Sequence, residues 1–270
     1  MKDLHIHTIY SDGEYDEYEI IERIKKAGIK EFAICDHNIY TGSRKVYDVL
    51  TSTNSDLIFH SGIELTCRLK DYNIPLNMHI LVRDFPFGNK DIDYLVNTYQ
   101  KYESIKLERM IKKVKELYDV DIPQSDISEA YKHSLTIGKP HIYTMLSKYK
   151  NIDMKQYYKD MDDLNTDDLK LDTLEVISIS NKIGASVILA HPIEIMEDHD
   201  LSFSDIDELC GFLKKKGLDE IETRHSKHDE KYYNEFHNIA IRHGLKESMG
   251  SDYHGEKVKP NVKLGKCYKE

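Results

Sequence analysis

The apolar positions of this chain alternate between strand-like runs and helix-like spacing, except in its middle third. Seven short apolar runs predict strands, which lie at 3–7, 32–35, 57–65, 78–82, 186–190, 218–222 and 246–249. Helical spacing falls between most of them, at 18–28, 43–50, 171–183, 206–217 and 229–243. Strands that alternate with helices favour a parallel, barrel-like α/β fold, although the third and fourth runs follow each other with no helix between them.

The segment 94–168 has a different pattern, which predicts an inserted helical subdomain. Two apolar stripes at helical spacing lie in it, namely Leu107, Ile111, Val114 and Leu117, and then Ile142, Met145, Leu146 and Tyr149. A capping box beginning at Asp126 predicts another helix, and Pro140 suits the first turn of the helix that follows. We expect an irregular return over 151–168. The predicted division is a barrel of 1–93 and 169–270 with a helical insertion of 94–168.

Composition and charge narrow the classes of partner. The formal net charge of −10 argues against an extended nucleic-acid surface, because phosphate backbones need clustered Lys and Arg. The four cysteines are scattered without a C-x-x-C pair, which is typical of free thiols in a reducing compartment. No apolar run approaches membrane-spanning length, and the first strand begins at once. We therefore expect a cytoplasmic protein that binds no membrane.

Residues suited to metal binding first appear at the start of the chain. His5 and His7 are two apart, so on a strand their side chains face the same side. After the Ser-Asp-Gly turn that follows, Asp12 can approach the same point. Two imidazoles and a carboxylate at a strand end form half of a metal site, although a polar edge strand with incidental histidines fits this stretch about equally.

Further His, Asp and Glu residues lie at the ends of other predicted strands. In parallel barrels the carboxyl ends of the strands meet at one face, where such side chains gather. The candidates at these ends are Asp36, His37, Glu64, His191, Asp252 and His254. His79 is the exception, because it lies at the start of its apolar run, where a core histidine is the more common occupant. The convergence of several strand ends favours a metal centre over surface chemistry.

Taken in order, these motifs resemble those of the PHP (polymerase and histidinol phosphatase) family. They are His-x-His followed by Ser-Asp-Gly at 5–13, Asp-His at 36–37, Gly-Ile-Glu at 62–64, Ala-His-Pro at 190–192 and Gly-Ser-Asp-Tyr-His-Gly at 250–255. The resemblance covers both ends of the chain. It implies a distorted seven-stranded (βα)7 TIM-like barrel that carries a trinuclear metal centre.

The resemblance also implies a ligand set and a mechanism. His5, His7, Glu64 and Asp252 would hold one metal, Glu64 would bridge to a second held by His79 and His191, and Asp12, His37 and His254 would hold the third. Nitrogen and oxygen ligands suit Mn²⁺, Zn²⁺ or Fe²⁺. A hydroxide that bridges two of the metals, held by Glu64 and its neighbours, would attack the phosphorus atom without a side-chain nucleophile.

Within the family, the chain is most similar to the branch of nucleoside 3′,5′-bisphosphate phosphatases and 5′-3′ exoribonucleases. The helical insertion and Ile-Gly-Lys-Pro-His at 137–141 carry this similarity. Lys139 stands where that branch more usually has Arg, and a lysine cannot grip phosphate bidentately. The start of this helix, with Lys139 and His141, is either a cradle for a second phosphate or an ordinary cap. Arg224 and His225 either bind phosphate or protonate the leaving group, or lie in a solvated loop.

We therefore expect a metal-dependent phosphoesterase that acts on a small phosphorylated substrate. A nucleoside 3′,5′-bisphosphate or a short 5′-phosphorylated oligonucleotide is the leading candidate. A phosphatase for AMP or histidinol phosphate is the nearest alternative, and a non-catalytic, metal-stabilised module is the alternative of another class. The complete ligand set favours an enzyme over that module.

Overall fold

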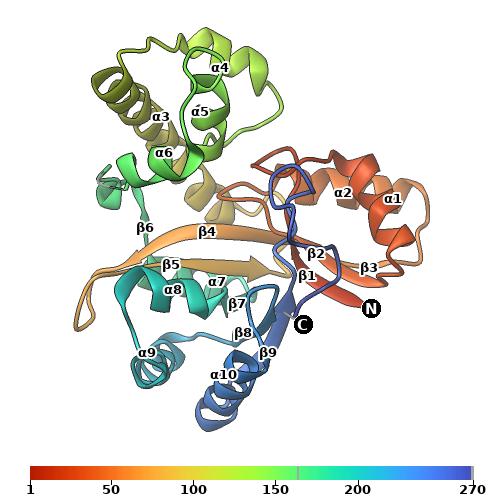
Figure 1. Cartoon of the computed structure of the whole chain (residues 1–270). Helices are drawn as coiled ribbons and strands as arrows, with labels where there is room; N and C mark the ends of the chain where they lie inside the picture. The colour runs from red at the N-terminus through yellow and green to blue at the C-terminus, as the bar shows by residue number, and fades with distance from the viewer. Residues whose placement is uncertain (163, 269–270) are drawn as a thin grey trace.

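The computed structural model describes residues 1–162 and 164–268, which form an α/β fold with an appended group of helices (Figure 1). The strands are β1 Lys2–Ile6, β2 Glu31–Ile34, β3 Ile58–His60, β4 Gly62–Leu69, β5 Leu76–Arg83, β6 Leu171–Asp172, β7 Ser186–Leu189, β8 Glu220–His225 and β9 Lys246–Gly250. A three-stranded parallel sheet has the order β1-β2-β3, and a six-stranded mixed sheet has the order β6-β4-β5-β7-β8-β9. The predicted α/β class is confirmed.

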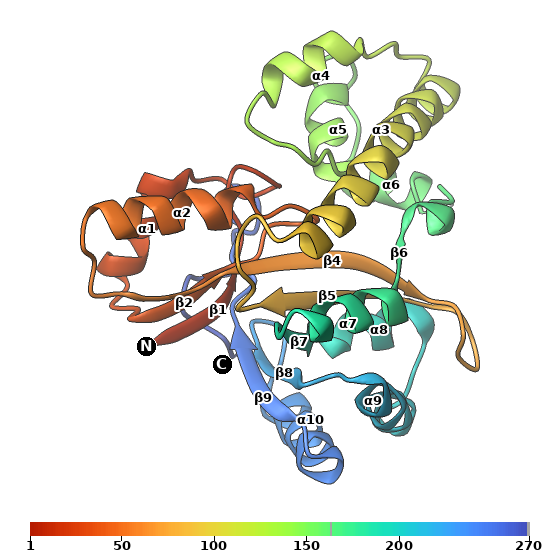
Figure 2. The same cartoon turned by 180° about the vertical axis from the view of Figure 1, so that it is seen from behind.

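Helices cover both sheets. The helices outside the insertion are α1 Glu17–Lys26, α2 Thr41–Ser52, α7 Thr173–Lys182, α8 Pro192–His199, α9 Phe203–Lys216 and α10 Glu230–His243. α1 and α2 lie beside the smaller sheet, whereas α7, α9 and α10 flank the larger one (Figure 2). All but α8 were expected from helical spacing. α9 ends where predicted, because Gly217 adopts the left-handed conformation (φ 109°) that glycine favours.

The two sheets meet at two places through isolated backbone contacts. Ile6 bridges to Tyr253 just beyond β9, and His37 bridges to Glu64 at the start of β4. The N–H of Asp252 donates to the carbonyl of His5 at 2.9 Å across the first junction. The described strands therefore surround a common centre, but a closed, continuously hydrogen-bonded seven-stranded barrel is not confirmed.

Two expectations about the middle strands were wrong in detail. The apolar run at 57–65 is two strands, because β3 pairs with β2 in the small sheet whereas β4 pairs with β5 in the large one. Glu64 therefore lies near the start of β4 rather than at the end of a strand. β5 runs antiparallel to both β4 and β7. His79, in the first half of β5, consequently reaches the edge where the parallel strands end. This explains why a candidate ligand lies at the start of its apolar run.

The insertion contains more regular structure than expected. Its elements are α3 Lys90–Tyr118, α4 Gln124–Ala130, α5 Lys139–Leu146, α6 Met154–Asp160 and the 3₁₀ helix η1 Asp167–Leu169. α6 and η1 lie in the segment 151–168 that we expected to be irregular. Asp126 lies inside α4, whose N-cap is Pro123, so the predicted capping box was wrong. Pro140 does occupy the first turn of α5.

The long helix α3 joins two apolar cores. Ile92, Leu95 and Tyr99 in its first half pack into the core of the large sheet. Leu107 and Val114 in its second half pack with α4, α5 and α6 in a separate core. The boundary between barrel and insertion at residue 93 or 94 stays a prediction. Because α3 is a continuous helix, it couples the position of the insertion to the large sheet.

The remaining expectations concern cysteines and membranes. All four cysteines lie in the described part of the chain, where they are buried and free. Burial raises the pKa of Cys35 to about 12, so its thiol is not poised for reaction. Within the described ranges, no helix is both long and apolar enough to cross a membrane. The cytoplasmic location stays a prediction.

Gly250 allows β9 to approach β1 closely, and its replacement provides a test of this junction. A Cβ at position 250 would lie 2.1 Å from the Cβ of His5 and 2.9 Å from Oε1 of Glu222. We expect Gly250→Ala to lower the free energy of unfolding by about 1–3 kcal/mol, measured by urea denaturation. Gly211→Ala is the control, because its new Cβ would meet only the His243 side chain. An equal cost for both variants would contradict this role of Gly250.

Candidate metal centre

The buried carboxylate of Glu64 lies at the centre of a histidine cluster. It is fully shielded from solvent. Five imidazole nitrogens lie within 3.1 Å of its oxygens, and they belong to His5, His7, His37, His79 and His191. Such a concentration of nitrogen ligands around one carboxylate is typical of a bridged metal site.

Two further carboxylates complete the cluster. Oδ1 of Asp252 lies 3.3 Å from Nε2 of His7 and 3.4 Å from Nδ1 of His254. Oδ1 of Asp12 lies 3.2 Å from Nε2 of His254, and its Oδ2 lies 3.8 Å from Nε2 of His37. The structure thus brings together all nine residues that the sequence nominated as metal ligands.

The donor atoms suit divalent metal ions. Four overlapping groups have ligand atoms within 4.8 Å of one another: His7, Asp12, His37 and His254; His5, His7, Glu64 and Asp252; His37, Glu64 and His79; and His79, His191 and Glu194. Both ring nitrogens of His7 and Oδ1 of Asp12 are buried without a hydrogen bond. Because buried polar atoms are rarely left without partners, these orphaned atoms fit a metal as the missing partner.

Burial and the neighbouring charges shift the pKa values of the cluster. Burial disfavours the charged imidazole of His7, but Asp252, Glu64 and Asp12 outweigh it and raise the pKa of His7 to about 9. Burial also opposes the charge on Glu64, yet the surrounding histidines hold the pKa of Glu64 well below its usual value. For His37 burial dominates and lowers the pKa to about 3. Metal binding therefore has to displace protons from some of these rings.

Residues behind the cluster orient its members. Oε1 of Glu222 lies 3.0 Å from Nδ1 of His5, which turns Nε2 of that ring toward Glu64. Oε2 of Glu222 accepts a hydrogen bond of 2.7 Å from the backbone N–H of His191. His191 and Asp252 both have positive φ, at 23° and 56°, a strained conformation that the surrounding contacts maintain.

Two buried aspartates hold the loops that carry the ligands. Asp36 accepts hydrogen bonds of 2.7 Å from the backbone N–H and the hydroxyl of Thr8 and from the hydroxyl of Ser11. Asp3 accepts bonds from the backbone N–H and hydroxyl of Ser251, at 2.9 and 2.6 Å. The first aspartate fixes the loop before Asp12, and the second fixes the turn before Asp252.

The four expected substrate-binding residues lie in different places. Lys139 lines a cavity beside the cluster, and Nε2 of His225 lies 3.6 Å from Oδ2 of Asp252. His141 lies outside that cavity, and its Nδ1 accepts from the backbone N–H of Gly138 at 3.0 Å. Arg224 is exposed and stacks over the ring of Tyr233 in α10, at 4.6 Å. The structure therefore brings Lys139 and His225 toward the cluster and places Arg224 against an outer helix.

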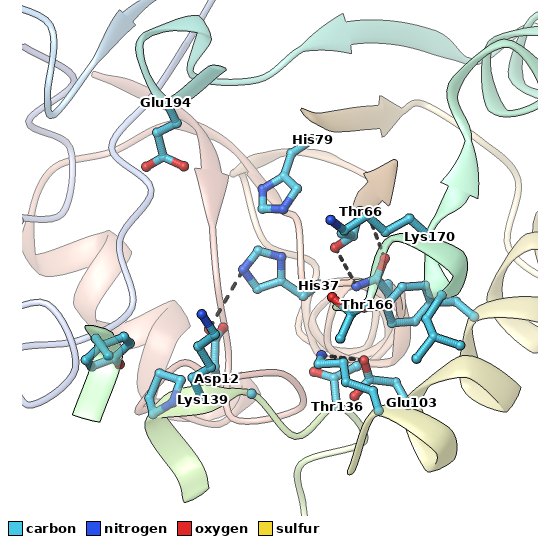
Figure 3. A pocket seen from close by; sticks show the side chains of 17 residues that line it. Asp12, His37, Thr66, His79, Glu103, Thr136, Lys139, Thr166, Lys170 and Glu194 are labelled. Atoms are coloured by element: carbon cyan, nitrogen blue, oxygen red, sulfur yellow. Dashed lines mark hydrogen bonds and ion pairs between the residues drawn. The ribbon is translucent and has the colours of Figure 1, made fainter. Parts of the chain in front are cut away.

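The cavity beside the cluster has a volume of about 570 Å³, and residues of the insertion such as Glu103 and Lys139 form part of its wall (Figure 3). Asp12, His37 and His79 form one side of it. Lysines from three separate elements line it, namely Lys106, Lys139 and Lys170, together with Glu194. Sequence reasoning nominated only Lys139, because the others belong to no motif and meet only through folding. The sequence did offer a reason to expect Glu194 near the cluster. It lies three residues after His191, which is about one helical turn, and side chains at that spacing are neighbours.

The geometry can be compared with known proteins. The sequence model of the PHP domain matches residues 3–251. The chain belongs to the PHP family. A PHP relative from Eggerthella lenta, named phosphoribosyl 1,2-cyclic phosphate 1,2-diphosphodiesterase, is 22% identical over 264 residues, which is 95% of each chain.

Two solved structures share the fold. One, from Bifidobacterium adolescentis and assigned as a metal-dependent phosphoesterase, has a TM-score of 0.79 and 24% identity over 98% of this chain and 91% of that one. The other, an amidohydrolase from Chromobacterium violaceum with bound sulfate and no metal, has a TM-score of 0.81 and 18% identity over 99% and 93%. The prediction of a PHP-family hydrolase of phosphoric esters is confirmed.

Glu222 offers a test of how the cluster is oriented. We expect Glu222→Gln to weaken Mn²⁺ binding by roughly 10–100-fold, because the amide cannot serve both His5 and His191 as an anionic acceptor. Competition with a chelator measures the affinity, and elemental analysis measures the metal content. Glu208→Gln on the exposed face of α9 is the control. Unchanged affinity in Glu222→Gln would show that Glu222 does not support the ligands.

Proposed function

We propose that this PHP protein hydrolyses phosphate esters of small ribose compounds that carry two phosphate groups, with nucleoside 3′,5′-bisphosphates and short 5′-phosphorylated oligonucleotides as the leading substrates. The observation that carries the proposal is the position of the cluster around Glu64. It opens directly into a cavity with three lysines, a combination that suits one phosphate at the metals and another beyond them.

We further propose three ions. His5, His7, Glu64 and Asp252 form a group that suits the first. Glu64 lies 2.8 Å from His79 and 2.9 Å from His191 through its other oxygen, which supports a second ion bridged by Glu64. Asp12, His37 and His254, with His7, form the group that suits the third. Mn²⁺, Zn²⁺ and Fe²⁺ all accept these ligands.

The residues of the chain have distinct tasks in this proposal. When bound, the ions supply Lewis acidity and positive charge at the phosphate ester. Glu222 and Asp36 keep the histidines and the loop before Asp12 in place. Lys139 holds the second phosphate, since its ammonium lies 3.4 Å from the exposed Asp162, a weak pair that a phosphate can replace.

A second candidate reaction is favoured by the relative from Eggerthella lenta, whose name gives a phosphoribosyl 1,2-cyclic phosphate as its substrate. That compound is also a ribose with two phosphoryl groups, one of them a cyclic diester. The same metal cluster and lysine-lined cavity would accept it. The two candidates differ in the bond broken, which belongs to a monoester or an open-chain diester in the first and to a cyclic diester in the second.

A substrate panel distinguishes the candidates. We expect the Mn²⁺-loaded protein to release phosphate from a nucleoside 3′,5′-bisphosphate, or mononucleotides from a 5′-phosphorylated trinucleotide, faster than it hydrolyses AMP or histidinol phosphate. Chromatography of the products and a phosphate assay measure these rates. Preferential opening of a ribose 1,2-cyclic phosphate would replace the leading substrate with the second candidate. If the metal-loaded protein hydrolysed none of these compounds, a non-catalytic module would be favoured instead.

Lys139 can be tested separately. We expect Lys139→Ala to raise KM for the preferred doubly phosphorylated substrate about tenfold, since a phosphate contact of about 1.4 kcal/mol is lost. KM for a singly phosphorylated compound should stay the same. Lys155→Ala on the exposed side of α6 is the matched control. An equal effect on both kinds of substrate would contradict the assignment of a second phosphate to Lys139.

A further inference from the structure

A second cavity lies next to the metal cluster, separate from the lysine-lined one. It has a volume of about 650 Å³, within the range of ligand-binding pockets. Its walls come from the loop at 9–14, the insertion between 130 and 158, and the segment 254–259. Asp12, Pro140 and Tyr158 line both cavities. A single molecule bound at the cluster can therefore extend into both.

Aromatic side chains of the insertion form one wall of this second cavity, and they are Tyr131, His141, Tyr143 and Tyr158. The hydroxyl of Tyr131 donates to the carbonyl of His141 at 3.3 Å, and the two rings pack with centroids 4.5 Å apart. The hydroxyl of Tyr143 donates to the carbonyl of Ile152 at 3.2 Å. These contacts fix both tyrosine rings, so they present preformed flat surfaces to a ligand.

A short segment of the insertion ties this wall to the metal cluster. The N–H of Leu135 donates to the carbonyl of Tyr10 at 2.9 Å, and the hydroxyl of Ser134 donates to the carbonyl of Ser11. Both acceptors lie just before Asp12. The aromatic wall therefore has a defined position relative to a proposed metal ligand. In Figure 1 this part of the insertion lies above the loop that follows β1.

Three lysines line each cavity, and in the second they are Lys132, Lys257 and Lys259. Lys132 is exposed, and Nζ of Lys257 lies 2.9 Å from Oε1 of Glu14. In the second cavity, Nζ of Lys259 lies 2.5 Å from Oδ2 of the buried Asp252. Diverting this lysine to a phosphate would leave a buried carboxylate without its partner, which is costly. In the first cavity, Lys139 pairs only weakly with an exposed carboxylate. The weakly paired Lys139 therefore favours a phosphate in the first cavity, and the aromatic wall favours a flat aromatic group in the second.

We propose that the second cavity is the subsite for the nucleobase of the substrate. This inference rests on the proposed function and deepens it, because it requires a substrate with a base as well as two phosphates. The scissile phosphate lies at the cluster, the second phosphate extends toward Lys139, and the base stacks on Tyr131. Stacking on an aromatic side chain changes affinity by on the order of ten- to a hundredfold per base.

Binding of two non-hydrolysable probes tests the subsite independently of catalysis. The probes are the 5′-methylenephosphonates of adenosine and of ribose, titrated calorimetrically into the Mn²⁺-loaded protein. We expect the adenosine compound to bind about 10–100-fold more tightly. Tyr131→Leu should remove most of this preference and leave the affinity for the ribose compound unchanged. Tyr131→Phe, which keeps the ring, should retain the preference, and Tyr18→Leu on the exposed side of α1 is the control.

The possible outcomes separate this inference from the proposed function. Equal affinity for the two probes, or no binding of either, would overturn the nucleobase subsite. An equal loss for both probes in Tyr131→Leu would also overturn it, because the tyrosine would then have a structural role only. A base preference in a protein that hydrolyses no bisphosphate would leave the subsite and reject the proposed function. Turnover of the bisphosphate without a base preference would support the proposed function and reject the nucleobase subsite.

Discussion

The structure depends on one buried carboxylate, that of Glu64, and on the five imidazoles that surround it. Burying so many ionisable groups together is costly unless each has a charged or coordinating partner. The carboxylates and imidazoles act as partners for one another, and this raises the pKa of His7 and lowers the pKa of Glu64. In our proposal the same atoms are the metal ligands. Metal binding and the stability of this centre are therefore coupled.

The strand arrangement follows from the need to bring these side chains together. β1 and β9 approach closely because Gly250 has no side chain, and the junction lets Asp252 reach His7. The reversed direction of β5 delivers His79 from the first half of a strand, where a parallel strand would have placed it at the opposite edge. The ring of strands is not continuously hydrogen-bonded, because the segments that carry the ligands leave the ladders near their ends.

The insertion lies beside a centre whose nine candidate ligands all come from outside it. α3 anchors it, since its first half belongs to the core of the large sheet and its second half to the core of the insertion. The segment around Ser134 then fixes the insertion to the loop before Asp12. Two cavities result, one containing Lys139, which pairs only with an exposed carboxylate, and one with an aromatic wall. In our proposals, residues of the strands and their loops hold the metals that hydrolyse the ester, and residues of the insertion bind the second phosphate and the base of the substrate.

The sequence by itself determined the α/β class and most helices, because these depend on local spacing. The nine metal-ligand candidates came from short motifs together with the resemblance to the PHP family. The sequence did not determine that 57–65 is two strands in different sheets, or that α6 is helical, since short apolar runs fit several structures. Only the tertiary structure decided where Lys106, Lys170, Glu222 and Lys259 lie, and which way Arg224 points. These residues belong to segments that are far apart in the chain. Packing between those segments brings the residues to the centre or directs them away from it, and local sequence spacing does not indicate such packing.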